Sequence, residues 1–288
     1  MSRHAIEEKF FRIFQVLSIF GFVIVTGFPL VYMIALSFKP IASLLLNPAN
    51  PFPTLEEISL LSYVRVLTPL EEGGAGFLGF MGNSLILSAT TVAIVIVLGV
   101  LGGYAAGRLR FRGRGGINFL IIVVYLFPGI LIAVPMFIFL TQPGLRPSLT
   151  GAVIVYVPIA LPLALFVLRN YLESIPEEID DAARIDGASR LQIIRLITVP
   201  LAMPAITAVA IYVFIAIWDE FLFALLILVD RRELWTVTLG IRQLSDLNGS
   251  PETVLMAGCV VITLPVVVAF TFAQRFLVDG LASGGVKE

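Results

Sequence analysis

Charged residues are scarce in this sequence. Asp, Glu, Lys and Arg together make up 14% of its 288 residues, whereas 58% are hydrophobic, and the mean hydropathy is +1.00. A water-soluble domain of this size needs a much larger charged surface than these residues can supply. The composition therefore excludes such a domain and indicates an integral membrane protein.

Residues that build catalytic or metal sites are almost absent too. The chain has one cysteine, Cys259, so it cannot form an internal disulfide, and one histidine, His4. It contains no HExxH, no GxSxG and no GxxxxGK(S/T) motif, which are signatures of zinc proteases, serine hydrolases and P-loop nucleotide sites. We expect no catalytic residue, no metal ligand, no cofactor bound by this chain and no nucleic-acid partner. The energy for any work that it performs must come from elsewhere.

Long apolar segments, in contrast, fill most of the chain. Six of them are long enough to cross a bilayer as a helix, which takes about 20 residues. They lie near residues 12–38, 82–107, 117–140, 151–169, 201–229 and 252–277. Prolines interrupt several segments, and a membrane tolerates such breaks only where neighbouring helices or a wet cavity satisfy the freed backbone groups. We therefore predict an all-α protein with a single transmembrane domain over residues 1–288, in which six transmembrane helices pack around a pathway.

Three glycines recur every four residues in the second apolar segment, at Gly99, Gly103 and Gly107. Small residues at this spacing share one face of a helix and let the backbones of two membrane helices approach closely. We expect this face to pack against another helix.

The distribution of Lys and Arg predicts the orientation, because the cytoplasmic loops of membrane proteins carry an excess of these residues. With the N-terminus inside, 13 of the 19 Lys and Arg residues lie on the cytoplasmic side. We therefore expect both termini and the polar segment 171–200 in the cytoplasm, and segments 39–81 and 230–251 as outer loops. The charged start leads into the first apolar segment without a small-residue cleavage site, which favours an uncleaved span over a signal peptide.

Segment 171–200 concentrates six acidic residues between two apolar segments. Two Ser-x-x-Glu/Gln patterns in it have the spacing of capping boxes, and each predicts the start of a short helix. They are formed by Ser174 with Glu177 and by Ser189 with Gln192. Gly187 lies between the two helices, where it can turn the chain through a positive φ, and the second helix is expected to end before Pro200. A polar helix–turn–helix between membrane spans indicates a solvent-exposed surface that binds a water-soluble partner.

Ionisable residues are nearly absent from the six apolar segments, and Asp219 and Glu220 in the fifth are the exceptions. Such residues within a membrane often mark a solute pathway. One interpretation makes them a polar wall of the substrate path, with Trp218 as a stacking surface for a sugar ring. The other makes them a polar cluster that packs helices. Asn83 and Ser84, at the start of the second segment, allow the same two interpretations.

The polar segment resembles the cytoplasmic "EAA loop" of the membrane subunits of ATP-binding-cassette (ABC) importers. That pattern is E-A-A-x-x-D-G-A followed later by Leu-Pro, and here residues 181–188 are D-A-A-R-I-D-G-A, followed by Val199 and Pro200. Asp181 replaces the usual Glu, and Val199 replaces Leu. Segments 104–111, 218–221 and 274–287 further resemble the G-type maltose permeases, so the likeness to the carbohydrate-importer branch covers nearly the whole chain.

This resemblance implies the type I ABC importer permease fold and a non-enzymatic subunit of an ATP-driven, binding-protein-dependent importer for a maltose-like or trehalose-like sugar. It implies a second, homologous permease, two ATPase subunits that bind ATP and Mg, and an extracytoplasmic solute-binding protein. It places the chain in the cytoplasmic membrane of a bacterium or archaeon, with the outer loop 230–251 reaching the binding protein. The residues that it implies for coupling to the ATPase are Asp181, Ala182, Ala183, Asp186, Gly187 and Ala188.

Two other classes of protein stay open. A secondary transporter acting alone would need ion-coupling charges or repeats that relate the two halves, and neither is clear in the sequence. A membrane scaffold could recruit a cytoplasmic ATPase without transporting anything. Within the importer class, a polyol or glycerol phosphate is an alternative to a sugar.

Overall fold

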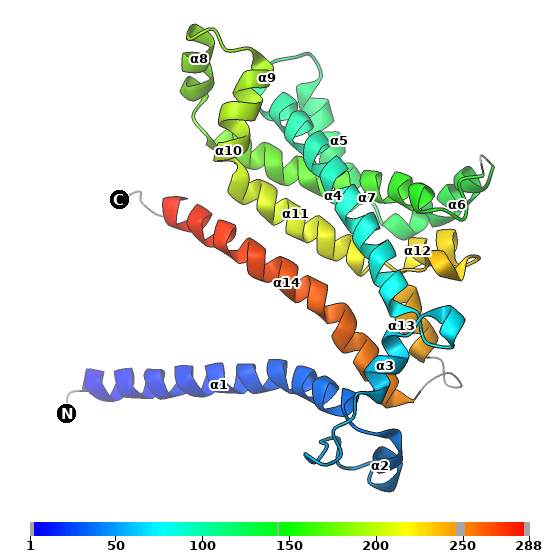
Figure 1. The fold of residues 1–288 in the computed structure, drawn as a ribbon. Coiled ribbons are helices and arrows are strands. Elements are labelled where there is room, and N and C mark those ends of the chain that lie inside the picture. Colours follow the sequence, from blue (N-terminus) through cyan, green and yellow to red (C-terminus); the bar gives the residue numbers. More distant parts are fainter. Residues whose placement is uncertain (1–2, 143, 246–250, 285–288) are drawn as a thin grey trace. The chain divides into compact units, whose positions relative to one another are not determined.

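The computed structural model describes residues 3–142, 144–245 and 251–284. Every regular element in these ranges is helical (Figure 1), so the predicted all-α class is confirmed. The α-helices are α1 Arg3–Ser37, α2 Ile41–Leu46, α3 Leu61–Leu67, α4 Phe77–Arg108, α5 Arg114–Leu126, α6 Ala133–Thr141, α7 Leu149–Ser174, α8 Glu177–Ile185, α9 Arg190–Ile193, α10 Val199–Leu201, α11 Met203–Trp218, α12 Leu222–Leu228, α13 Val237–Ser245 and α14 Glu252–Gly284. Short helical turns lie at Leu70–Glu72, Gly129–Ile132 and Arg232–Leu234, and a π-helix lies at Ile194–Thr198.

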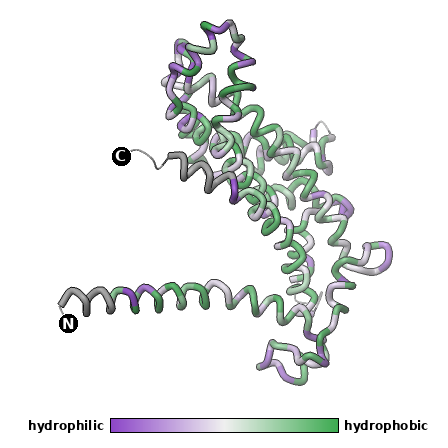
Figure 2. Tube along the Cα trace, turned by 60° about the vertical axis from the view of Figure 1, so that its left-hand side comes forward, coloured by the Kyte–Doolittle hydropathy of each residue, from purple (hydrophilic) through white to green (hydrophobic). Residues whose placement is uncertain are grey.

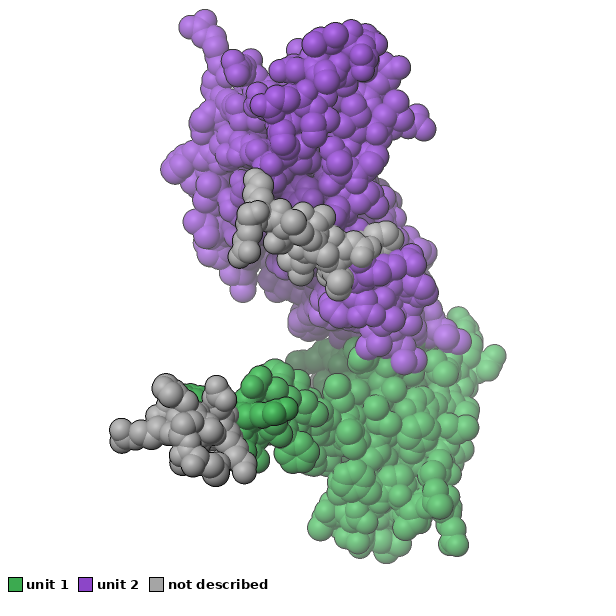
Figure 3. Space-filling model, turned by 90° about the vertical axis from the view of Figure 1, so that its left-hand side faces the viewer, with its two compact units in different colours: residues 1–77, 241–263 green, residues 78–240, 264–288 purple. Residues whose placement is uncertain are grey.

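The chain forms two compact units (Figure 3). The first unit comprises residues 1–77 and 241–263, and the second unit comprises residues 78–240 and 264–288. Helix α14 contributes its beginning to the first unit and its remainder to the second. The candidate site described below lies wholly in the second unit.

Helix α1 of the first unit is hydrophobic along most of its length (Figure 2). Its apolar side chains are exposed, with Phe22 72% and Val25 74% accessible. A helix that is apolar all round suits a lipid environment or other helices. At its end, the Ser37 hydroxyl lies 2.7 Å from the Tyr63 hydroxyl, which ties α1 to the segment that follows it.

Helix α7 is central to the second unit, because α5, α11 and α12 all pack against it. Its buried face includes Val155, Tyr156, Ala164 and Leu168, which belong to the hydrophobic core of this unit. Helices α5, α11 and α12 therefore share α7 as their packing partner.

Helices α4 and α7 approach each other closely through the three glycines predicted for this purpose. A Cβ atom at Gly103 would lie 3.2 Å from the backbone nitrogen of Arg169, and one at Gly99 would lie 3.0 Å from Leu168. A Cβ at Gly107 would lie 3.4 Å from the carbonyl oxygen of Arg169. The predicted helix-packing face is confirmed.

Four helical stretches are long and apolar enough to cross a membrane: Phe11–Ser37, Phe77–Arg108, Leu149–Ser174 and Glu252–Arg275. Two bent pairs raise the total to six if each counts as one span: Arg114–Leu126 with Gly129–Thr141, bent by 90°, and Arg190–Leu201 with Met203–Trp218, bent by 78°. The described residues thus allow the predicted six spans, whose number and orientation stay predictions.

Two expected spans are interrupted. The segment expected at 117–140 breaks at Phe127, whose extended backbone (ψ 125°) precedes Pro128, as proline requires of the residue before it. The segment expected at 201–229 stops at Trp218 and starts again at Leu222. Apolar length alone therefore does not show where these helices bend.

Gly103→Leu is expected to force α4 away from α7, because the new side chain meets backbone that cannot move aside. Overpacking of this kind costs about 1–3 kcal/mol, which thermal unfolding of the detergent-solubilised protein would measure. Gly79→Leu is the matched control in the same helix, because a Cβ at Gly79 has nothing within 4 Å. Equal loss of stability in both variants would contradict the close packing.

Candidate functional site

The polar segment forms α8, a turn and α9. Helix α8 begins after Pro176, and three acidic residues, Glu177, Glu178 and Asp180, lie in its first turn, where negative charge interacts favourably with the helix dipole. The capping box predicted for Ser174 and Glu177 is wrong. Helix α7 continues through Ser174, and the Ser174 hydroxyl donates a hydrogen bond of 2.7 Å to the Tyr171 carbonyl in its own helix.

The turn after α8 has the geometry predicted for glycine. Gly187 adopts φ +81°, and its amide donates to the carbonyl of Arg184 at 3.1 Å while the Ala188 amide donates to the carbonyl of Ala183 at 2.9 Å. This pair of bonds is the Schellman motif, in which a left-handed residue satisfies the last carbonyls of a helix. The positive φ predicted for Gly187 is confirmed.

The second predicted capping box is present at the start of α9. The Ser189 hydroxyl accepts a hydrogen bond from the Gln192 amide, and the Gln192 side chain accepts one from the Ser189 amide. The expected end before Pro200 is wrong, because helix continues through the π-helix Ile194–Thr198 to Leu201. The wider π turn relieves the clash that the Pro200 ring would otherwise make with the preceding turn.

The turn presents most of the predicted coupling residues to solvent. Asp181, Ala182, Asp186 and Gly187 are exposed, Ala188 is half-buried and Ala183 is buried. Beside them Ile185 is 87% exposed. A single exposed apolar side chain is common on protein surfaces, so the geometry of the turn distinguishes this segment more than its hydrophobicity does.

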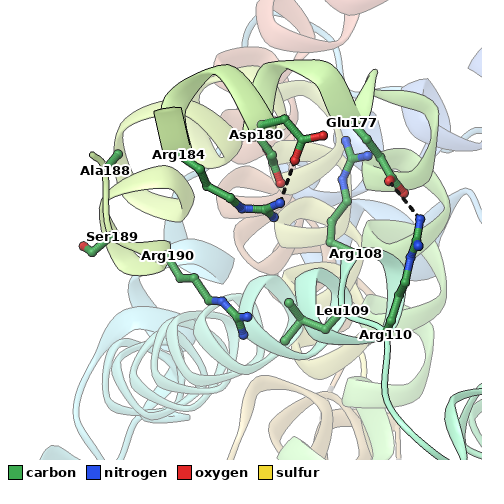
Figure 4. Close-up of a pocket in the computed structure, with 10 residues that line it drawn as sticks. Arg108, Leu109, Arg110, Glu177, Asp180, Arg184, Ala188, Ser189 and Arg190 are labelled. Atoms are coloured by element: carbon green, nitrogen blue, oxygen red, sulfur yellow. Dashed lines mark hydrogen bonds and ion pairs between the residues drawn. The ribbon is translucent and has the colours of Figure 1, made fainter. Parts of the chain in front are cut away.

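Behind the turn lies a cavity of about 710 Å³ with a charged lining. Figure 4 shows that side chains of α8 face those at the end of α4 across it. Four guanidinium groups and three carboxylates line it, from Arg108, Arg110, Arg184 and Arg190 and from Glu177, Asp180 and Asp181. Arg184 forms an ion pair with Asp181 at 2.7 Å. A hydrogen bond with the Tyr104 hydroxyl is the main cause that raises the pKa of Arg184 above its usual value. Figure 2 shows the hydrophilic residues of α8 and α9, which lie around this cavity.

A second polar cluster joins α4, the break between α11 and α12, and the segment before α13. The side-chain amide of Asn83 donates to the carbonyls of Glu233 at 2.8 Å and Trp235 at 3.0 Å. The Ser84 hydroxyl accepts a hydrogen bond of 3.0 Å from the Val237 amide. These two side chains therefore hold segment 233–237 against the start of α4.

Glu220 holds the break after α11 together. Its carboxylate accepts hydrogen bonds from the backbone amides of Phe223 at 2.8 Å and Ala224 at 3.0 Å, which start α12. The Tyr156 hydroxyl on α7 donates to the same carboxylate at 2.8 Å, and the Thr238 hydroxyl donates to the Glu220 carbonyl at 2.8 Å. This geometry favours the helix-packing interpretation for Glu220.

Trp218 and Asp219 differ from Glu220 in their surroundings. Trp218 is buried, and its ring stacks on Phe214 with centroids 5.6 Å apart. Asp219 is exposed, and its side chain makes no hydrogen bond or ion pair within the described residues. Of the five residues predicted for a substrate path, none lines the apolar groove of about 760 Å³ formed by α4, α11 and α14 in this unit. Among these five residues, Asp219 is the one whose polar side-chain group has no partner within the described residues.

The arrangement offers interaction surfaces rather than reactive groups. No three His, Cys, Asp or Glu side chains in the described ranges come close enough to hold a metal ion. The carboxylates in the cavity face guanidinium groups, which suits charge-mediated contact.

Comparison with known protein families matches residues 96–283 to one described as "Binding-protein-dependent transport system inner membrane component". The chain belongs to this family. The matched range contains α8, the Gly187 turn and the cavity behind it, and the resemblance recognised in segment 171–200 is thereby confirmed.

Individual relatives cover nearly the whole chain. The inner membrane ABC transporter permease protein YcjP of Escherichia coli is 38% identical over 92% of this chain and 93% of its own length. The trehalose/maltose transport system permease protein MalG of Thermococcus litoralis is 32% identical over 98% of this chain and 99% of its own. A similar fold is found in a solved chain of a bacterial ABC transporter involved in the import of the acidic polysaccharide alginate. The two structures match with a TM-score of 0.79 and 24% sequence identity over 96% of this chain and 98% of that chain. The predicted permease fold is confirmed at this level.

Several residues of this inner-membrane component escaped prediction. Tyr104 donates a hydrogen bond of 3.0 Å to buried Asp180, and Arg108 donates one of 2.5 Å to the carbonyl of Ile175. Both partners are about 70 positions away along the chain, and such a pairing leaves no local signal. The sequence shows an arginine at every second position from 108 to 114, but it does not show which groups these arginines bind.

Glu220→Ala is expected to lower the free energy of unfolding by about 2–4 kcal/mol, because two amides and a buried hydroxyl lose their acceptor. Asp219→Ala is the matched control and should stay within about 0.5 kcal/mol of the unchanged protein. Thermal unfolding in detergent would measure both. A stability loss as large for Asp219→Ala as for Glu220→Ala would show that the two carboxylates share one packing role.

Proposed function

We propose that this chain is one of two permease subunits in an ATP-driven importer and that its Gly187 turn docks onto an ATPase subunit. The single observation that carries this proposal is the exposed turn at 181–188, built rigidly by the Schellman motif and the Ser189 capping box and placed within the matched family range. ATP and Mg would be bound by the ATPase subunits, since this sequence has no P-loop motif.

The proposed partners are a second, homologous permease, two ATPase subunits and an extracytoplasmic solute-binding protein. Family membership supports the binding protein, because the family description names binding-protein-dependent transport. We place the chain in the cytoplasmic membrane with the turn inside, as the excess of Lys and Arg on that side indicates.

We further propose a sugar or oligosaccharide as the solute. The relative from Thermococcus litoralis is named for trehalose and maltose, and it aligns over almost the full length of both chains. A glycerol phosphate is less favoured, because the segments placed outside contain few basic residues.

The proposed mechanism is a reciprocal coupling between two ends of one complex. ATP closes the ATPase pair, the docked turns move with it as rigid bodies, and the membrane helices change from an inward-open to an outward-open cavity. The loaded binding protein must favour the same ATP-closed state, because a ligand without preference between two states shifts neither.

Purification of the chain with its neighbours tests this function directly. The expected result is a stable complex with two ATPase copies that imports solute into proteoliposomes only with ATP and the binding protein. Uptake by this chain alone would instead establish a secondary transporter. A complex with ATPase that imports nothing would establish a scaffold.

Gly187→Val should uncouple ATP hydrolysis from uptake within that complex. A β-branched residue in the left-handed region costs about 1–2 kcal/mol, and the turn can avoid this cost only by changing shape. Gly187→Asn is the matched control, since asparagine tolerates this conformation better, and it should retain most of the coupling. Normal receptor-stimulated hydrolysis and uptake in Gly187→Val would exclude docking through this turn.

A further inference from the structure

Asp180 is a buried carboxylate on an otherwise exposed helix. It is 4% exposed, whereas Glu177, Glu178 and Asp181 on the same helix are exposed. A buried carboxylate is unfavourable unless it is paired or hydrogen-bonded. Asp180 therefore does not face a partner protein, and its charge must be satisfied within this chain.

Its partner is Tyr104, which is itself 2% exposed and lies on α4 one turn before the end of that helix. The Tyr104 hydroxyl donates to Asp180 Oδ2 at 3.0 Å. From the end of α4, Arg108 donates to the carbonyl of Ile175, immediately before α8. The inner end of α4 thus holds both the start and the buried face of α8.

Arg184 of α8 also interacts with the Tyr104 hydroxyl. The ion pair between Arg110 and Glu177 is a weaker contact between these segments. Arg110 and Glu177 are 4.0 Å apart, with side chains 90% and 60% exposed, and exposed ion pairs at such distances contribute little. The hydrogen bond between Tyr104 and Asp180 is therefore the buried polar link through which α8 can pull on α4.

Helix α4 is firmly attached to α7 at this end. Besides the glycine packing, the Arg114 guanidinium donates to the carbonyls of Ala106 and Gly107 at the end of α4. It also pairs with Glu173 of α7 at 3.0 Å, and Arg169 binds the same carboxylate at 3.1 Å. A displacement of α4 must therefore move α7 with it.

The opposite end of α4 carries the other polar attachment. Ser84 and Asn83 hold segment 233–237, and Ser84 and Tyr104 are separated by 20 positions in one unbroken helix. At a rise of about 1.5 Å per residue this separation is about 30 Å, which is the thickness of the hydrocarbon core of a bilayer. One rigid element thus joins the turn region to segment 233–237.

We propose that Tyr104 and Asp180 are positioning residues that form a latch between α8 and α4, and that α4 is the strut that carries the movement of α8 across the membrane to segment 233–237. This inference rests on the proposed function. It assigns Asp180 to transmission inside the permease and leaves Asp181 as the acidic residue that faces the ATPase.

The test uses the assembled complex in proteoliposomes with its binding protein. Tyr104→Phe removes one oxygen atom, and Asp180→Asn removes the charge while keeping the shape. Each is expected to lower the solute imported per ATP hydrolysed by about tenfold, as for loss of a buried hydrogen bond to a charged group, while ATPase copies still co-purify. Asp180→Glu keeps the negative charge and should recover part of the ratio.

Tyr171→Phe is the matched control, because it removes a hydroxyl that donates to the Leu201 carbonyl at 3.3 Å without joining α8 to α4. It should leave the import-to-hydrolysis ratio unchanged. The double variant Tyr104→Phe with Asp180→Asn should be no worse than Tyr104→Phe alone, because the Asp180 charge acts on α4 through the hydrogen bond that Tyr104→Phe already removes.

Three results separate the possible failures. An unchanged ratio in Tyr104→Phe would overturn the latch, as would losses that multiply in the double variant. If Asp180→Asn assembles poorly, Tyr104→Phe decides the question alone. If the unaltered complex does not import solute with ATP, the proposed function fails, whatever the variants do.

Discussion

A helix surrounded by lipid has to satisfy its backbone polar groups without water, and this constraint shapes the break between α11 and α12. Where α11 stops and α12 begins, the freed amides of Phe223 and Ala224 find the Glu220 carboxylate, and that carboxylate is completed by Tyr156 of the central helix. The break is therefore held open by side chains that come from two helices. A carboxylate in an apolar segment needs no ion-coupling role to be there.

Two groups of polar residues in the second unit lie at the two ends of α4. One group surrounds the turn between α8 and α9, and the other surrounds segment 233–237 and Glu220. Between them α4 is nearly free of charge and packs through glycine backbone against α7. In the proposed importer, α4 is the element that connects these two groups.

Local signals predicted the local parts of the candidate site. Gly187 and the Ser189 box were predicted correctly, because a positive φ and a capping hydroxyl depend on residues within a few positions of each other. The Ser174 box failed although its spacing was equally good, since α7 ran on through that residue and used its hydroxyl first. Pro200 did not end its helix, because a π turn made room for the ring. In both failures the helix that contains the residue continued past the point at which the short-range rule would end it.

The sequence by itself determined that the chain is helical and apolar enough for a membrane, that glycines line one face of its second apolar segment, and that an exposed turn lies at Gly187. It did so because hydropathy, helical period and turn chemistry are properties of neighbouring residues. The tertiary structure decided that Asp180 is buried against Tyr104, whereas Asp181 is exposed. It also decided that Asn83, Ser84 and Glu220 bind backbone groups instead of lining an open substrate path. Apart from the cap that Glu220 makes on the first turn of α12, these contacts join residues 64 to 153 positions apart. Only the packing of helices brings such residues within hydrogen-bond distance.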